Sequence, residues 1–352
     1  MKKYFLTAIA LFATVLGCFA QAPVVEGASY YLPKTALKFS LLIEKTTFTP
    51  GEMADYSIRL FQQNEDVLYP KTSYRILSMR MDPVGVPDEK KHYTALVNPK
   101  MSIQKVYSNN DGIIMAVNTE PTVSYDVAKP FVAAPKPAPL RARDFMSQEI
   151  LAAGSKAKMA QLCAKEIYNI RDARNELTRG QAETMPKDGE QLRLMMASMD
   201  QQERALTELF TGTTVCDTLE EVFVYCNDGE VEKNVLFRFS EFYGFCEAND
   251  LSGAPYYISI KDLHRTPEDT RTEKEKMKQK DDTGLYINVP GQAHVSIYQQ
   301  ERLWVERDFT YAQFGRVENL GTGLFNKKLE TTYEVVPTTG QMINMKSEMA
   351  TK

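Results

Sequence analysis

The sequence predicts an α+β protein in which two mostly antiparallel β regions bracket a long antiparallel helical hairpin. Residues 30–47 alternate apolar and polar side chains, a pattern typical of a strand with one buried face. Residues 144–211 instead carry apolar side chains at helical spacing. Beyond residue 212 the strand pattern returns, with turn signals between its segments.

Residues 1–20 are predicted to be a signal peptide. Two lysines precede an apolar run from Phe5 to Gly17, which is shorter than the roughly 20 residues that a membrane-spanning helix needs. The residues before Gln21 suit ordinary signal peptidase, whereas Val15 to Cys18 resembles a lipobox in which Cys18 would be lipidated. Either route predicts an exported protein, periplasmic or outer-membrane-associated, that contacts a membrane only through such a lipid.

The amino-acid composition limits the classes of partner that the protein is expected to bind. The chain of 352 residues carries 42 basic and 46 acidic side chains, and this acidic balance argues against nucleic acid as a partner. With 43% apolar and 25% charged residues it is ordinary for a globular protein, so we expect a hydrophobic core and only local disorder.

Four cysteines follow the signal peptide, and an even number in an exported chain allows disulfides. If residues 213–226 form one strand, Cys216 and Cys226 lie roughly 33 Å apart, beyond the reach of a disulfide. Cys216 with Cys246 is the candidate pairing. The alternative is that all four, including Cys163, are small buried thiols.

Residues 21–128 are predicted to form a β-rich region with one short helix. After the strand at 30–47, Thr49-Pro50-Gly51-Glu52 has the pattern of a capping box, which predicts a helix to about Gln62. From residue 74 to 118 we expect several short strands. The turns between them are predicted at Asp82-Pro83, Asn98-Pro99 and Asn109 to Gly112.

Residues 129–143 are predicted to be an extended linker because they are rich in proline and bury little. The helical region of residues 144–211 follows, and its first helix has Gly180 as a stop signal. Asp188 is placed to cap the second, which ends near Gly212. The two apolar stripes are Met159, Cys163, Ile167, Ile170 and Leu177 on the first helix, and Leu192, Met195, Met196, Met199, Leu206 and Phe210 on the second.

Residues 212–352 are predicted to form the second β-rich region. Asn227-Asp228-Gly229-Glu230 between two apolar runs is a strong hairpin signal. Residues 264–282 hold 12 charged side chains of 19 and are expected to form a mobile or helical surface excursion, with partner docking as the alternative. Periodicity leaves open whether the two β regions share one sheet system or form separate domains.

Several segments together resemble an uncharacterised family of exported Bacteroides-type proteins of about 350 residues, described only as a domain of unknown function. The resemblance spans nearly the whole mature chain. It implies a Gram-negative envelope location and the same order of strands, helical hairpin and strands, but it supplies no activity, substrate or catalytic residue. The segments that carry it are residues 30–37, 166–171, 185–189, 235–240, 288–291 and 324–328.

No catalytic residue, cofactor site or metal site is predicted. The histidines His92, His264 and His294 are far apart in sequence and belong to no metal-binding motif, so we interpret them as solvated or packed side chains. The sequence contains no G-x-S-x-G elbow and no C-x-x-C motif. Asp250 lies among turn-forming residues and is interpreted as a turn residue rather than an acid catalyst.

A group of charged side chains and a group of methionines on the predicted helices each allow two interpretations. Arg171, Asp172, Arg174 and Glu176 are expected to make weak ion pairs on an exposed helix face, with a ligand-binding arginine pair as the alternative. The run Met195, Met196 and Met199 is interpreted as core, although methionine also suits partner surfaces. Trp304 is expected to pack within a strand.

The leading functional hypothesis is a non-catalytic envelope protein that binds a partner protein or surface component through residues 144–211. The export signal, the lack of catalytic motifs and the proline-rich linker before the helices motivate it. One alternative is a glycan-directed hydrolase, whose paired carboxylates can come from distant strands without leaving a local motif. Another is a carrier for a small apolar ligand, which requires an enclosed cavity.

Overall fold

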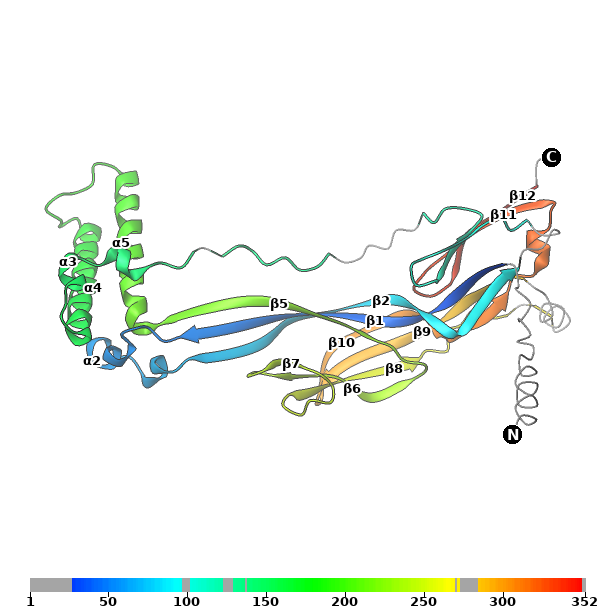
Figure 1. Ribbon diagram of the computed structural model, residues 1–352, viewed down its shortest axis with the longest axis horizontal. Coiled ribbons are helices and arrows are strands. Elements are labelled where there is room, and N and C mark those ends of the chain that lie inside the picture. Colours follow the sequence, from blue (N-terminus) through cyan, green and yellow to red (C-terminus); the bar gives the residue numbers. More distant parts are fainter. Residues whose placement is uncertain are drawn as a thin grey trace, which may run out of the picture.

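The computed structural model describes residues 27–96, 102–122, 129–136, 138–269, 271–272 and 284–349. The predicted signal peptide and Cys18 therefore lie outside the described residues, as does most of the charged excursion. The molecule is elongated, with helices gathered at one end and strands running along the rest of its length (Figure 1).

The central element is a three-stranded antiparallel sheet with the order β2-β1-β5, which we call the ribbon. Its middle strand β1 has 23 residues and spans roughly 75 Å. β1 pairs with β2 from Gly27 opposite Leu96 to Phe48 opposite Lys71. It pairs with β5 from Leu37 opposite Tyr225 to Thr49 opposite Thr213. The strands of the ribbon are β1 (Gly27–Thr49), β2 (Lys71–Leu96) and β5 (Thr213–Tyr225).

Two further antiparallel sheets pack on the ribbon. The five-stranded sheet has the order β10-β9-β8-β6-β7, and the four-stranded sheet has the order β12-β11-β4-β3. Their strands are β6 (Val231–Ser240), β7 (Gly244–Cys246), β8 (Ala254–Asp262), β9 (Tyr286–Gln299) and β10 (Arg302–Asn319), and β3 (Val106–Ser108), β4 (Ile114–Val117), β11 (Leu329–Val335) and β12 (Met342–Met349).

The predicted α+β class, with two β regions bracketing a long antiparallel helical hairpin, is wrong. Of the described residues, 47% lie in strands and 24% in helices, so the protein is mostly β. The β regions do not lie on either side of the helices as separate blocks, because β5 pairs with β1 and β11 pairs with β4. Strands from both halves of the chain thus share sheets, which answers the question that periodicity left open.

The helices form a small cluster at one end of the ribbon, which we call the tip (Figure 1). Its elements are the 3-10 turns η1 (Ala54–Tyr56), η2 (Glu65–Leu68) and η3 (Ala142–Phe145) and the helices α2 (Ser57–Phe61), α3 (Gln148–Leu151), α4 (Lys156–Arg179) and α5 (Gly189–Thr211); a further 3-10 turn, η4 (Thr322–Phe325), lies at the other end. Local signals set the bounds of α4 and α5. The Ser155 hydroxyl accepts from Lys158 N–H, Gly180 ends α4 at φ 69°, and the Asp188 carboxylate accepts from Gln191 N–H.

Three local predictions failed in the β regions. Asp82-Pro83 does not break a strand, because β2 continues through it opposite Lys38 and Leu37. β2 is an edge strand, where a proline needs no outward-facing N–H. Residues 227–230 do not close a hairpin either: β5 pairs with β1, whereas β6 pairs with β7 and β8, so this turn crosses from one sheet to another.

The capping box at Thr49 was the third error. Thr49 ends β1, and the first helical turn begins only at Ala54. Gly51 instead lies against the end of α5, where an added Cβ would come within 2.1 Å of the Leu209 carbonyl oxygen. Met53 N–H donates to that same oxygen at 2.7 Å, so a tertiary contact with α5 determines this turn.

The main core lies between the ribbon and the five-stranded sheet. The alternating apolar side chains of β1 point into it, as their spacing predicts for one buried face. A second core joins the start of β1 to the four-stranded sheet, and a third fills the tip. Fully buried members of the main core include Leu37, Phe39, Leu41, Phe237, Ile258, Ile260, Val295, Ile297 and Tyr311.

Candidate functional site

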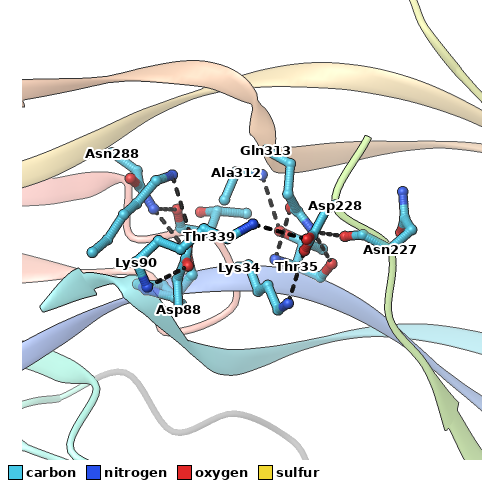
Figure 2. Close-up of polar contacts among 12 residues, drawn as sticks. Lys34, Thr35, Asp88, Lys90, Asn227, Asp228, Asn288, Ala312, Gln313 and Thr339 are labelled. Atoms are coloured by element: carbon cyan, nitrogen blue, oxygen red, sulfur yellow. Dashed lines mark hydrogen bonds and ion pairs between the residues drawn. The ribbon is translucent and has the colours of Figure 1, made fainter. Parts of the chain in front are cut away.

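A buried polar junction connects the ribbon to both other sheets (Figure 2). Thr35 on β1 is fully buried, and its backbone is held from both sides by the Gln313 side chain on β10. Thr35 N–H donates to Gln313 Oε1 at 2.9 Å, and Gln313 Nε2 donates back to the Thr35 carbonyl at 2.7 Å. The Thr35 hydroxyl donates to the Thr338 carbonyl, on the turn between β11 and β12, and accepts from Ala312 N–H.

The same junction fixes the turn between β5 and β6. Gln313 Nε2 also donates to the Asn227 carbonyl at 3.0 Å, and the Asp228 carboxylate lies 3.0 Å from both Lys34 Nζ and Lys90 Nζ. Hydrogen bonds from the two lysines, Lys34 first, lower the pKa of Asp228. Sequence reasoning placed a turn at 227–230 but missed that its function is to dock two sheets.

Asp228→Asn is expected to destabilise the protein near neutral pH and to have a smaller effect in acid. Because the folded-state pKa of Asp228 is lowered, its contribution is present above the unfolded-state pKa of about 3.9 and is lost as pH falls through the folded value. Urea midpoints of wild type and variant, measured at neutral pH and below about pH 3, test this. A difference that stays constant across this range would contradict the ion pairing.

Asn288 completes the junction from β9. It is 1% exposed, and its Nδ2 donates to the Pro33 carbonyl at 2.8 Å and to the Thr339 carbonyl at 3.0 Å. Its backbone N–H donates to the Gly340 carbonyl. The buried junction side chains Thr35, Gln313 and Asn288 are neutral and bind backbone groups of neighbouring elements, although Asn288 Oδ1 is buried without a hydrogen-bond partner in the described residues. We therefore interpret the junction as a structural joint that sets the position of the ribbon.

The tip offers a different kind of surface. α4 and α5 pack through a core that includes Cys163, Ile167, Leu206 and Phe210. This core covers only the C-terminal part of α5, because none of the apolar side chains between residues 189 and 204 is fully buried. Leu194 is 57% exposed. The first half of α5 therefore presents an apolar stripe that this chain covers only in part.

A groove of about 380 Å³ runs between α4 and α5 at this stripe. Met195 and Met199 line it, and Met199 also packs against the core of the tip, as the core interpretation predicted for it. Methionine side chains adapt easily to partners of varied shape. The other lining residues are Glu166, Asn169, Ile170, Ala173, Ser198 and Gln202.

The arginines of α4 pair with α5. Arg171 Nε lies 2.6 Å from Glu203 Oε1, and an Arg174 guanidinium nitrogen lies 2.9 Å from Asp200 Oδ1 and 2.8 Å from Glu203 Oε2. Asp172 and Glu176, which the sequence grouped with these arginines, make none of these contacts. The pairs are partly exposed, so each contributes little stability, but together they set how the two helices meet.

Two more grooves lie at the neck, where the tip joins the ribbon. One of about 470 Å³ is lined by residues 49–52, by residues 140–144 and by the end of α5, including Glu208. The other, of about 690 Å³, lies between Lys136 with residues 138–140, the second half of α5 and the start of β5. Both are open rather than enclosed, so neither is the sealed cavity that an apolar ligand carrier requires.

Residues 129–136 and 138–141, which we call the strap, lead along the ribbon to the tip. The strap runs alongside β5 (Figure 1) and is extended, as its proline content predicts. Phe131 N–H donates to Glu220 Oε2 at 2.7 Å, and Lys136 pairs with Asp217. The Phe131 hydrogen bond, together with one from the Ser40 hydroxyl, lowers the pKa of Glu220. The sequence predicted the extended segment but not its docking on β5.

The structure gives each histidine different neighbours. His92 stacks on Tyr31, with ring centroids 4.5 Å apart, and His264 Nδ1 lies 3.1 Å from Asp262. His294 Nδ1 lies 2.7 Å from Asp308 on β10. In the described part of the chain, no three His, Cys, Asp or Glu side chains are grouped so as to hold a metal ion.

Asp250 and Trp304 lie in a turn and beside the main core, respectively. Asp250 lies in the turn between β7 and β8, where its Oδ1 accepts from Ser252 N–H and hydroxyl at 2.9 and 2.5 Å. Trp304 packs edge-on against Tyr256 in the main core.

No described helix combines the length and apolar character needed to cross a membrane.

The four described cysteines are free thiols. Cys163 is buried in the tip, and burial raises the pKa of its thiol to about 11. Cys216 is exposed on β5, whereas Cys246 is buried on β7 of the five-stranded sheet. The structure therefore does not join the predicted pair, and Cys226 is exposed at the end of β5.

Among the comparisons with known proteins, only the one with sequence families gives a match. No curated protein and no solved structure matches it. A family described as a domain of unknown function, DUF4831, matches residues 26–343, which include the tip, the strap and every strand except most of β12. Because this match spans most of the chain, the protein belongs to the DUF4831 family.

Proposed function

We propose that the protein is a non-catalytic binding protein of the cell envelope whose tip holds a partner protein. The observation that carries this proposal is the partly covered apolar stripe of α5 beside the methionine-lined groove. The family supplies no activity, so the proposal rests on this surface and on the sequence pattern of residues 1–20.

The geometry suits recognition of an apolar helix or loop. Interfaces have an apolar centre with a polar rim, and binding energy is concentrated in a few apolar anchors near that centre. The groove has this composition: Ile170, Met195 and Met199 are apolar, whereas Glu166 and Gln202 are polar. The long ribbon places this surface at one extreme of the molecule, away from the other two sheets (Figure 1).

Site-specific crosslinking in cells tests the binding site. A photo-crosslinking residue in place of Leu194 on α5 is expected to capture a defined partner. The matched control is the same residue in place of Leu303, which is 50% exposed on β10, a strand that lies away from the tip (Figure 1). The double variant Met195→Glu/Met199→Glu should reduce capture about ten-fold or more, since charges in an apolar contact cost several kcal/mol.

Two controls keep this result interpretable. Gln191→Glu adds one charge to an exposed position of the same helix and should leave capture unchanged. Thermal unfolding of each variant verifies that the tip remains folded. Equal crosslinking from Leu194 and Leu303, or full capture by the double methionine variant, would contradict the tip as the binding site.

Envelope location is tested separately. Mass spectrometry of the mature N-terminus is expected to show a chain beginning at Gln21 or at a lipidated Cys18. An uncleaved chain that fractionates with cytoplasmic proteins would rule out export without bearing on the tip.

A further inference from the structure

Within the described residues, no strand pairs with the outer edge of β5. β5 has 13 residues and ends the ribbon order β2-β1-β5, so it pairs with β1 on one side only. No backbone hydrogen bond from another described segment reaches its outer side. Natural proteins usually block an edge of this length, because its unpaired N–H and C=O groups form a template for another strand.

The strap lies beside this edge without pairing to it. Pro130, Pro135 and Pro139 lack the N–H group that a strand ladder requires. The strap contacts side chains of β5 instead of its backbone: Phe131 N–H donates to the Glu220 carboxylate, and Lys136 pairs with Asp217. The 690 Å³ groove between strap and β5 shows that open space remains along the start of the edge.

The side chains of β5 determine what kind of strand fits. Four apolar side chains are each 42–53% exposed and would gain cover from an added strand: Val215, Leu219, Val222 and Val224. Asp217, Glu220 and Glu221 lie among them, and β5 carries no basic residue. An added strand with lysine or arginine would therefore complement it.

A second copy of β5 is disfavoured in the register that centres the two strands on Leu219. In an antiparallel pair of two β5 strands centred on Leu219, Asp217 would lie opposite Glu221, and like charges directly opposite are destabilising. The strap already shows the favoured charge, since its Lys136 binds Asp217.

We infer that the outer edge of β5 binds an extended, basic strand of a partner protein by β-augmentation, with the strap as a weak intramolecular competitor. In this mode, main-chain hydrogen bonds supply affinity and alternate side chains supply specificity. The inference concerns a surface distinct from the α4–α5 groove and does not rest on the function proposed for the tip.

Peptide binding to the full chain tests this inference. The probe is a fluorescent peptide of roughly nine residues, a typical strand length, that alternates lysine with valine or threonine. One comparison peptide has glutamate in place of lysine, and another has proline at its centre. We expect the basic peptide to bind and to slow hydrogen exchange of β5 amides. The glutamate and proline peptides should do neither.

Variants of the protein separate pairing from general attraction. Asp217→Lys/Glu220→Lys also removes both strap contacts, so it is compared with the strap-released variant Phe131→Pro/Lys136→Ala and should bind the basic peptide about ten-fold or more weakly than that variant. Glu232→Lys/Glu301→Lys makes the same charge change elsewhere and should have little effect. Phe131→Pro/Lys136→Ala removes both strap contacts and should strengthen binding. If the charge-reversed variant fails to fold, Glu221→Lys at an exposed position replaces it.

Three results would overturn the inference. These are equal binding of the proline-containing peptide, protection of amides outside β5 alone, and no binding of the basic peptide to the strap-released variant. Each is independent of whether the tip captures a partner.

Discussion

Phe237→Ala is expected to lower the free energy of unfolding by about 3–5 kcal/mol, the range measured for buried phenylalanine truncations. Phe237 lies on β6, is fully buried, and faces the ribbon. Its ring centroid lies 4.6 Å from that of Tyr256, 5.6 Å from Phe245 and 5.8 Å from Phe223 on β5. Truncation thus removes contacts with both the ribbon and the five-stranded sheet, and it leaves a cavity that neighbouring strands cannot readily fill.

Chemical denaturation of wild type and variant measures this loss. Phe242→Ala is the matched control, because Phe242 is 69% exposed on the turn between β6 and β7 and should change stability by less than about 0.5 kcal/mol. If the two substitutions cost the same, the five-stranded sheet does not pack on the ribbon as described.

Gln313→Ala is the second substitution expected to have a large effect, with a loss of at least about 2 kcal/mol. It removes the partners of Thr35 N–H, the Thr35 carbonyl and the Asn227 carbonyl. Each buried polar group left without a hydrogen bond costs about 1–3 kcal/mol, and Thr35 is fully buried. The turn at 227–230 should also loosen, because Gln313 ties it to β1.

Hydrogen exchange distinguishes this loss from a simple packing defect. In Gln313→Ala, exchange of the Thr35 amide should accelerate more than exchange of amides in the tip. Gln313→Leu, which keeps most of the volume, should behave like Gln313→Ala because the hydrogen bonds are lost in both. Gln292→Ala on the exposed side of β9 is the control. A leucine variant as stable as wild type would show that the hydrogen bonds of Gln313 contribute little.

Local sequence signals located many elements correctly. The alternation of Leu37, Phe39, Leu41 and Ile43 predicts a strand with one buried face, and all four side chains are buried. The Asn109 turn is equally local, since its Oδ1 accepts from Asp111 N–H and Ile113 N–H. Such features depend on side-chain periodicity and on hydrogen bonds within a few residues, so the sequence alone specifies them.

Local turn signals predicted a strand break that does not occur and a hairpin that does not form. Asp82-Pro83 signals a turn in isolation, but the pairing of β2 with β1 on both sides of the proline keeps the strand intact. Asn227 to Glu230 signals a hairpin, yet contacts with Lys34, Lys90 and Gln313 hold this turn between two sheets. In both cases residues distant in sequence supply contacts that outweigh the local preference.

The sequence by itself therefore determined membership in the DUF4831 family, the buried face of β1, the helix caps at Gly180 and Asp188, and an extended proline-rich segment. Only the tertiary structure decided that strands from both halves of the chain share sheets, that Thr35 and Gln313 meet, and that the strap lies beside the outer edge of β5. The physical reason is the distance along the sequence over which each interaction acts. Periodicity and capping act over a few residues, whereas strand pairing and the satisfaction of buried polar groups depend on which distant segments the fold brings together.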